Sequence, residues 1–259
     1  MSKATKKTIR NSKHYKLLLW TFLIAGVGLL IFIGYFVFSY MNSLPADESA
    51  YQSATKGEKV NITNKGSYYA IESIQGTNTG LIFYPGSFVN PKAYIASYYT
   101  LAQSGINVYV IQSPLNFALI NSDQAKIVIK EHPNITNWFV AGHSLGGVAA
   151  CEFVKHDPGA VNGLILLGSY CNGDAKNLSV PVLSISASND GLSTPQKISN
   201  SRQYLPNNTE FVEINGANHT QFGTFAKTQP GDNQPTISQA EAQAEITTVI
   251  TEFINKNSD

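Results

Sequence analysis

The sequence predicts an α/β protein with a mainly parallel central sheet covered by helices on both faces. From Ser67 onward, short apolar runs typical of strands alternate with longer amphipathic stretches typical of helices. The inner runs at 137–142 and 180–187 are almost continuously apolar, as in strands buried on both faces. A nucleotide-binding doubly wound sheet is the rival architecture, but the chain has neither G-x-G-x-x-G after its first strand nor a phosphate-cradling loop.

The expected elements follow one another at the spacing of strand–helix repeats. Strands are expected at 68–73, 80–85, 106–113, 137–142, 161–168, 180–187 and 210–214. Helices are expected at 91–104, 122–131, 194–204 and 239–255, and another begins at Leu145. The apolar residues of the first and last helices recur at three- and four-residue steps, which places them on one buried face.

The N-terminal part of the chain has the properties of a membrane anchor. Residues 17–41 carry no charge, and as a helix they would be about 37 Å long, more than the ~30 Å of a hydrocarbon layer. Trp20 and Tyr40 lie near the two ends, where amphipathic rings favour the interface. A cleaved signal peptide would have a shorter apolar run and a small-residue cleavage site, and 38–50 contains no strong one.

Charge sets the expected topology. Residues 1–16 form a basic tail without an acidic residue, which the positive-inside rule retains in the cytoplasm. The expected protein is therefore single-pass in the cell membrane, with an extracytoplasmic C-terminal domain at 66–259 after a polar tether at 42–65. The net charge of +1 argues against a nucleic-acid partner.

The cysteine and histidine patterns predict no metal site. There is no C-x-x-C pair and no Cys/His cluster with zinc spacing. Cys151 and Cys171 are expected to be small buried apolar residues, with a disulfide between them as the alternative.

A candidate nucleophile lies between a strand and a helix. Residues 142–146 read Gly-His-Ser-Leu-Gly and match G-x-S-x-G. This pattern places a serine on a strained turn with its hydroxyl exposed, and the flanking glycines remove side chains that would clash there. Its position after a buried strand and before a helix makes Ser144 the expected nucleophile.

A nucleophilic serine needs a base and an acid that orients the base. Of the five histidines, His219 follows the last expected strand, where a loop at the catalytic edge would place it. Asp190 follows the preceding strand and is the expected acid, with Asp174 as the alternative. The chain order Ser144, Asp190, His219 differs from the orders of trypsin and subtilisin.

Acyl-transfer chemistry also needs donors for an oxyanion. The N–H of Leu145, directly after the nucleophile, is the first expected donor. The second is expected in the loop after the strand at 80–85, from Ser87 or, as second choice, Phe88. Phe88 and Phe222 are weaker candidates for lining a substrate pocket, because aromatic residues equally fill cores.

Several segments together resemble the small bacterial α/β hydrolases related to dienelactone hydrolases (carboxymethylenebutenolidases). These are GLIFYPGSFVNPKAYI, AGHSLGGVAA, SNDGL, NGANHTQFG and QPGD, and the similarity runs from about Gly80 to the C-terminus. The resemblance implies an eight-stranded type of sheet, a Ser-Asp-His triad and no metal or organic cofactor. Dienelactone hydrolases proper have a cysteine nucleophile, whereas this chain has Ser144, so their substrate is not carried over.

The expected activity is hydrolysis of carboxylic esters or thioesters through an acyl-enzyme on Ser144. The short segment between Gly168 and Val180 leaves no room for a helical cap, so an open site without a large lid is expected. The substrate would be a small-molecule or cell-envelope acyl compound. The alternatives are an acyltransferase or peptidase acting on envelope material, and a non-catalytic binding module that keeps the fold.

Overall fold

The computed structural model describes residues 3–258 and divides the chain into two compact units, Met1–Asn42 and Ser43–Asp259. The first unit is one helix, α1 (Lys3–Met41). Its part Tyr15–Met41 has a mean hydropathy of 2.5 and is long and apolar enough to cross a membrane. The expected anchor at 17–41 lies within this helix. The side chains of residues 1–14, which carry most of the basic tail, lie outside the described part.

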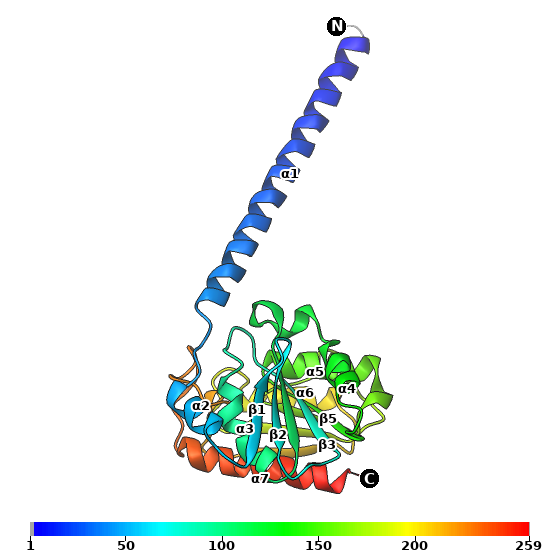
Figure 1. Ribbon diagram of the computed structural model, residues 1–259. Coiled ribbons are helices and arrows are strands. Elements are labelled where there is room, and N and C mark those ends of the chain that lie inside the picture. Colours follow the sequence, from blue (N-terminus) through cyan, green and yellow to red (C-terminus); the bar gives the residue numbers. More distant parts are fainter. Residues whose placement is uncertain (1–2, 259) are drawn as a thin grey trace. The chain divides into compact units, whose positions relative to one another are not determined.

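The second unit is built on one sheet with the strand order β1-β2-β4-β3-β5-β6-β7-β8. Neighbouring strands run parallel from β4 to β8, whereas β2 is antiparallel to both β1 and β4 (Figure 1). The strands are β1 (Val60–Asn64), β2 (Tyr68–Ser73), β3 (Thr79–Tyr84), β4 (Asn107–Ile111), β5 (Asn137–His143), β6 (Gly163–Leu167), β7 (Val182–Ala187) and β8 (Glu210–Ile214). The predicted mainly parallel α/β architecture is confirmed.

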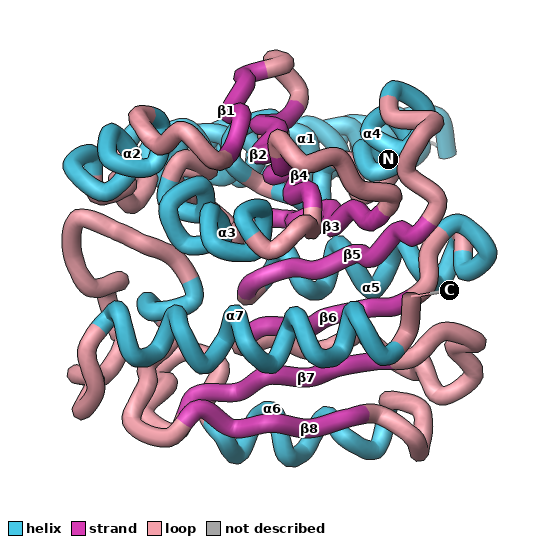
Figure 2. The backbone as a smooth tube through the Cα atoms, turned by 60° about the horizontal axis from the view of Figure 1, so that its bottom comes forward, coloured by secondary structure: helices cyan, strands magenta, loops and turns pink. Residues whose placement is uncertain are grey.

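Helices cover both faces of the sheet. Figure 2 shows α3 and α7 over one face, with α5 and α6 behind the strands. The two faces bury separate apolar clusters, so each strand of the sheet centre is apolar on both sides. The helices are α2 (Glu48–Thr55), α3 (Ala93–Gln103), α4 (Gln124–Glu131), α5 (Leu145–His156), α6 (Pro195–Ser201) and α7 (Gln239–Lys256).

The C-terminal helix, α7, shows which residues determine where a helix begins and which of its faces is buried. Ser238 caps α7 by accepting a hydrogen bond from the Glu241 N–H, and the Glu241 carboxylate accepts one from the Ser238 N–H. Ile246, Ile250 and Phe253 then form the buried stripe at the helical spacing expected from the sequence.

The segment expected to be a tether is largely folded into the second unit. Residues 42–65 include α2 and β1, and β1 pairs with β2 along its whole length. Leu44 is 5% exposed, its N–H donates to the Phe88 carbonyl at 2.8 Å and its carbonyl accepts the Asn90 N–H at 2.9 Å. The segment is polar by composition, but its few apolar residues are spaced to pack beside α3. The domain therefore begins at Ser43 and not at residue 66.

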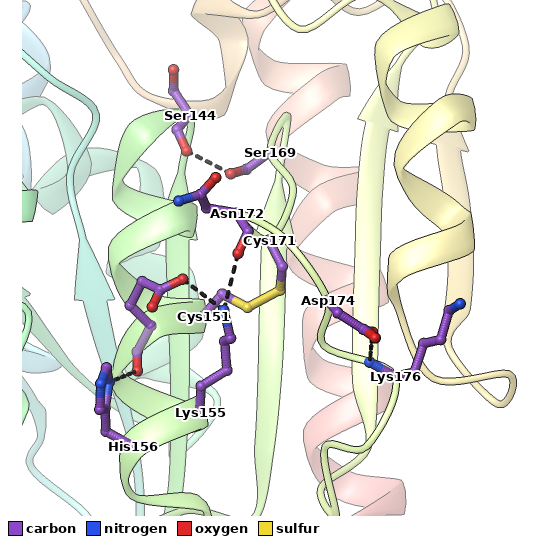
Figure 3. Close-up of a disulfide and its surroundings, with 10 residues drawn as sticks. Ser144, Cys151, Lys155, His156, Ser169, Cys171, Asn172, Asp174 and Lys176 are labelled. Atoms are coloured by element: carbon purple, nitrogen blue, oxygen red, sulfur yellow. Dashed lines mark hydrogen bonds and ion pairs between the residues drawn. A yellow bond between two sulfur atoms is a disulfide. The ribbon is translucent and has the colours of Figure 1, made fainter.

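Cys151 and Cys171 form a disulfide with their Cα atoms 5.5 Å apart. The expectation of free apolar cysteines is therefore wrong and the alternative is correct. The bond joins α5 to the loop after β6 (Figure 3), and the Lys155 ammonium adds a hydrogen bond to the Asn172 carbonyl at 2.9 Å. The helix that follows Ser144 is thus covalently fixed to a loop at the same edge of the sheet.

Replacing both cysteines, C151S with C171S, is expected to lower the free energy of unfolding by about 3 kcal/mol, because the closed loop spans 20 residues. For a domain of this size the midpoint of thermal unfolding should fall by roughly 6–12 °C. The measurement is thermal unfolding of the full chain in detergent, with and without reductant. Reductant should shift the wild type and leave the double variant unchanged; an equal shift in both proteins would contradict the prediction.

Candidate active site

Ser144 occupies a strained turn between β5 and α5. Its backbone angles are φ 54° and ψ −127°, a conformation that non-glycine residues rarely adopt. A Cβ at Gly142 would collide with the Gly146 backbone, and a Cβ at Gly146 would collide with the backbone of Tyr84 and Pro85. Both flanking glycines are therefore required for the strand and helix to approach this closely.

Two contacts hold the backbone of this turn. The Ser144 N–H donates to the Leu167 carbonyl at 3.0 Å, and the Ser144 carbonyl accepts from the Ser169 hydroxyl at 2.5 Å. Figure 3 shows the Ser144 hydroxyl directed away from Ser169. Ser169 follows β6 and was not anticipated from the sequence, since nothing in its neighbourhood marks it.

His219 and Asp190 form a buried pair. His219 Nδ1 lies 2.7 Å from Asp190 Oδ2, and neither side chain is exposed. The other oxygen of Asp190 accepts the N–H groups of Leu192 at 2.8 Å and Ser193 at 2.6 Å. Because a carboxylate only accepts, Nδ1 carries the proton and Nε2 is left as the basic nitrogen. Asp190 therefore fixes both the orientation and the tautomer of the ring.

The end of β6 brings this pair next to Ser144. Leu167 accepts the Ser144 N–H, and a Cβ on the next residue, Gly168, would lie 3.1 Å from both Asp190 Oδ2 and His219 Nδ1. His219 Nε2 is buried and makes no hydrogen bond within the described residues. The bond between Ser144 and His219 is thus not formed in this structure; catalytic hydrogen bonds are often long until substrate binds.

The alternative acid lies elsewhere. Asp174 is exposed on the loop after β6, where its carboxylate accepts the Lys176 N–H at 3.0 Å (Figure 3). The acid that contacts His219 is therefore Asp190.

The two expected oxyanion donors come from different segments. Leu145 is the first residue of α5, where N–H groups lack intrahelical partners. The loop after β3 packs against the start of α5, since a Cβ on Gly146 would touch Pro85. Phe88 donates its N–H to the Asn116 carbonyl at 2.8 Å, so it is already engaged. Of the two expected loop donors, the geometry therefore favours Ser87.

A family model described as the alpha/beta hydrolase family matches residues 80–245. The chain belongs to the alpha/beta hydrolase family. A crystal structure of MGS-MChE2, an alpha/beta hydrolase enzyme from a metagenome of sediments of the Mar Chica lagoon in Morocco, is similar with a TM-score of 0.57 at 15% identity. That match covers 77% of this chain and all of the other, and it shows the common fold. No curated protein matches the chain.

Of the two aromatic residues expected to line a substrate pocket, Phe88 lies beside the candidate site and Phe222 is buried in the core. Phe88 is half-buried with φ 52°, and its ring stacks on Phe117 at 5.6 Å beside the site. Phe222 has no exposed surface, so it does not line an open pocket. Its ring packs 5.3 Å from His143 and 6.4 Å from His219. Phe222 is therefore a core residue that packs against the His143 and His219 rings.

His143, next to Ser144, is a residue of the candidate site that the sequence did not reveal. Its ring is fully buried and lies 4.4 Å from the His219 ring. The Gly86 N–H donates to the Tyr94 hydroxyl at 3.1 Å, and the same hydroxyl is hydrogen-bonded to His143 Nδ1 at 2.8 Å. This chain of contacts joins the loop before Ser87 to the ring that supports His219.

Asp232 is a third residue of the candidate site that was missed. Its Oδ1 accepts the Gly191 N–H at 3.0 Å and the His219 N–H at 3.3 Å. Its Oδ2 accepts the N–H and the hydroxyl of Thr220 at 2.7 and 2.6 Å. One carboxylate thus joins the loop of the acid to the loop of the base. The only sequence signal was the QPGD segment, in which no role for the aspartate was visible.

Asp232→Asn should slow the reaction of Ser144 with a fluorophosphonate about tenfold, equivalent to ~1.4 kcal/mol. An amide has one acceptor oxygen in place of two, and its NH₂ group would face backbone donors, so the two loops would separate. Asp174→Asn is the matched control, because that exposed carboxylate also accepts a backbone N–H but does not contact the site. The measurement is the labelling rate with circular dichroism as a check on folding. Equal rates for both variants would contradict the role of Asp232.

Burial lowers the pKa of His143 well below its usual value of about 6.5, and a charge on the neighbouring His219 lowers it further. The unfolded chain therefore binds a proton on His143 more tightly than the folded protein does. The stability contributed by the neutral, buried ring is fully present above about pH 6.5, and it is lost as the pH falls below that value. The free energy of unfolding then decreases by up to ~1.4 kcal/mol per pH unit.

His143→Phe keeps a ring but removes this titration, so its unfolding free energy should fall less between pH 7 and pH 5. Burial also lowers the pKa of His132, which stays in both proteins, so the difference between them isolates His143. The measurement is urea unfolding of the full chain in detergent at several pH values. Parallel pH profiles for the two proteins would refute the prediction.

Proposed function

We propose that the chain is a membrane-anchored serine hydrolase that cleaves carboxylic esters or thioesters through an acyl-enzyme on Ser144. The observation that carries this proposal is the buried 2.7 Å contact between Asp190 and His219 beside the strained turn of Ser144. A binding module of the same family would have no need to keep an oriented imidazole next to a half-buried serine on a strained turn. The resemblance to dienelactone hydrolases supports the class of chemistry, while the serine nucleophile separates the proposed substrates from theirs.

The proposed reaction has two halves. The Ser144 oxygen attacks the carbonyl carbon as its proton passes to His219 Nε2, and the resulting imidazolium is stabilised by Asp190. The negative oxygen of the tetrahedral intermediate accepts N–H bonds from Leu145 and Ser87. His219 then protonates the leaving alkoxide or thiolate. In the second half, His219 takes a proton from water, the hydroxide attacks the acyl carbon, and the proton returns to Ser144 as the acid departs.

The proposal includes single-pass anchoring with the catalytic domain outside the cytoplasm. The apolar helix at Tyr15–Met41 and the basic residues that precede it support this orientation. The disulfide between Cys151 and Cys171 supports it independently, because disulfides persist in oxidising compartments. The substrate class that fits this location is a small-molecule or cell-envelope acyl compound.

The site is proposed to be open. The segment between β6 and β7 contains no helix, and the disulfide holds its first part on α5. An inserted cap of the kind that closes over long acyl chains therefore has no place there.

The full chain in detergent should react covalently with a fluorophosphonate, while Ser144→Ala should not react. His219→Ala should react at least about a hundredfold more slowly, since general-base assistance contributes on the order of 10²–10⁴ in rate. Asp190→Asn should also be slow, and Asp174→Asn is the matched control that should react like the wild type. The measurement is labelling followed by gel fluorescence and mass spectrometry of the modified peptide. Unlabelled but correctly folded wild-type protein would refute the proposed activity.

A further inference from the structure

The loop between β4 and α4 exposes an unusual amount of apolar surface. Leu115, Leu119 and Ile120 are 40%, 39% and 51% exposed. The other exposed large apolar residues within Ser43–258 are not neighbours in the sequence: they are Ile74, Ile127, Tyr170 and Tyr204. Ile74 follows β2, and the two tyrosines line a separate pocket together with polar residues. We call residues 115–120 the apolar loop. Clustered apolar surface of this kind marks a contact with a partner or a membrane.

The apolar loop borders the active site. It follows the C-terminal end of β4, and Ser144 follows the C-terminal end of β5. Because β4 and β5 both run parallel to β3, the two ends lie at the same edge of the sheet. The Asn116 carbonyl accepts the Phe88 N–H at 2.8 Å, and Phe117 stacks on the Phe88 ring at 5.6 Å. Phe88 directly follows Ser87, the proposed oxyanion donor.

The same loop is attached to the chain that leaves the apolar helix. The Asn116 side-chain amide donates to the Ser43 hydroxyl at 3.2 Å, and Leu44 donates to the Phe88 carbonyl at 2.8 Å. The helix ends at Met41, so three Cα steps, at most about 11 Å, separate its end from Leu44. The chain therefore enters the second unit beside the apolar loop, within three residues of the last helical residue.

The backbone of the apolar loop is strained. Leu115 and Asn116 have φ values of 55° and 50°, and neither is glycine. A non-glycine residue in this left-handed conformation destabilises the fold by on the order of 1–3 kcal/mol, and the conformation persists only where surrounding contacts hold it. Here the hydrogen bonds of Asn116 to Phe88 and Ser43 hold the turn, and Leu115 remains exposed at its tip.

We propose that the apolar loop inserts into the surface of the bilayer that carries the apolar helix, so that Ser144 acts on acyl esters located at the lipid surface. The short connection from Met41 to Leu44 favours a membrane over a protein partner as the occupant. Residues 113–121 carry no charge, so the contact depends on apolar burial and not on anionic lipids. This inference rests on the proposed function for its substrate, but its membrane contact can be tested independently of catalysis.

The chemistry of the substrate follows from this arrangement. A compound whose acyl chain stays in the lipid while its ester carbonyl lies among the headgroups would reach Ser144 without entering a deep tunnel. The proposed substrate class is therefore an amphiphilic ester or thioester presented by the membrane, in agreement with a site that has no cap.

The membrane contact is tested by fluorescence of the full chain in phosphatidylcholine vesicles. Both native cysteines are bonded, so L119C and, as control, I74C each provide a single free thiol for an NBD probe. NBD at position 119 should be blue-shifted and quenched by nitroxide-labelled lipids, and NBD at position 74 should be neither. Added phosphatidylglycerol should not change the result. Equal exposure of both probes to water would overturn the proposal, as would a blue shift without nitroxide quenching, which indicates a second copy of the chain.

The substrate class is tested with two esters in the same vesicles. The triple variant L115S/L119S/I120S should hydrolyse soluble 4-nitrophenyl butyrate like the wild type, but vesicle-bound 4-methylumbelliferyl oleate about tenfold more slowly, because less apolar area anchors the loop. I74S is the control for replacing an exposed isoleucine, beside the single variant I120S. Equal loss on both esters, or no loss on either, would overturn the inference. Wild type inactive on both esters and towards fluorophosphonate would instead refute the proposed function, while the NBD result would still decide the membrane contact.

Discussion

The hydrogen bond between Asp190 and His219 is the contact around which the rest of the site is arranged. It joins residues from two loops that follow β7 and β8, and it lies against Gly168 at the end of β6. The neighbouring residue, Leu167, holds the backbone of Ser144. Because parallel strands end at one edge of the sheet, four separate segments meet there. A single buried hydrogen bond determines which nitrogen of the imidazole remains free to act as a base.

Most of the fold could be predicted because its signals are local. The apolar runs of the inner strands and the stripe of α7 need no knowledge of distant neighbours. The G-x-S-x-G pattern is local as well, since a strained turn between a strand and a helix requires glycines within two residues of the serine. The roles of Asp190 and His219 were inferred from the ends of strands, and the structure brings their side chains into contact.

What could not be predicted depends on contacts between distant segments. Residues 43–65 are polar, and their place in the fold is decided by hydrogen bonds to Phe88 and by pairing of β1 with β2. Asp232 resembles any turn aspartate until the loops of Asp190 and His219 are seen on either side of it. The disulfide forms because α5 and the loop after β6 lie close together in the fold, and the sequence separation of the two cysteines does not reveal this. Tertiary context also made Phe222 a core residue.

Leu44 pairs with the loop at 88–90 only three residues after the end of α1, and this has a consequence for cleavage of the chain by proteases. Many ectodomains leave the membrane through a long unstructured stalk, which is where sheddases cut. Here Leu44 is already hydrogen-bonded into the domain three positions after the last helical residue, and α2 begins at Glu48. A protease therefore finds little extended chain to bind, and cleavage would require local unfolding of residues 44–46, where Leu44 pairs with the loop that follows Ser87. Under the proposed function, such unfolding would also disturb the active site, so proteolytic release and catalysis would exclude one another.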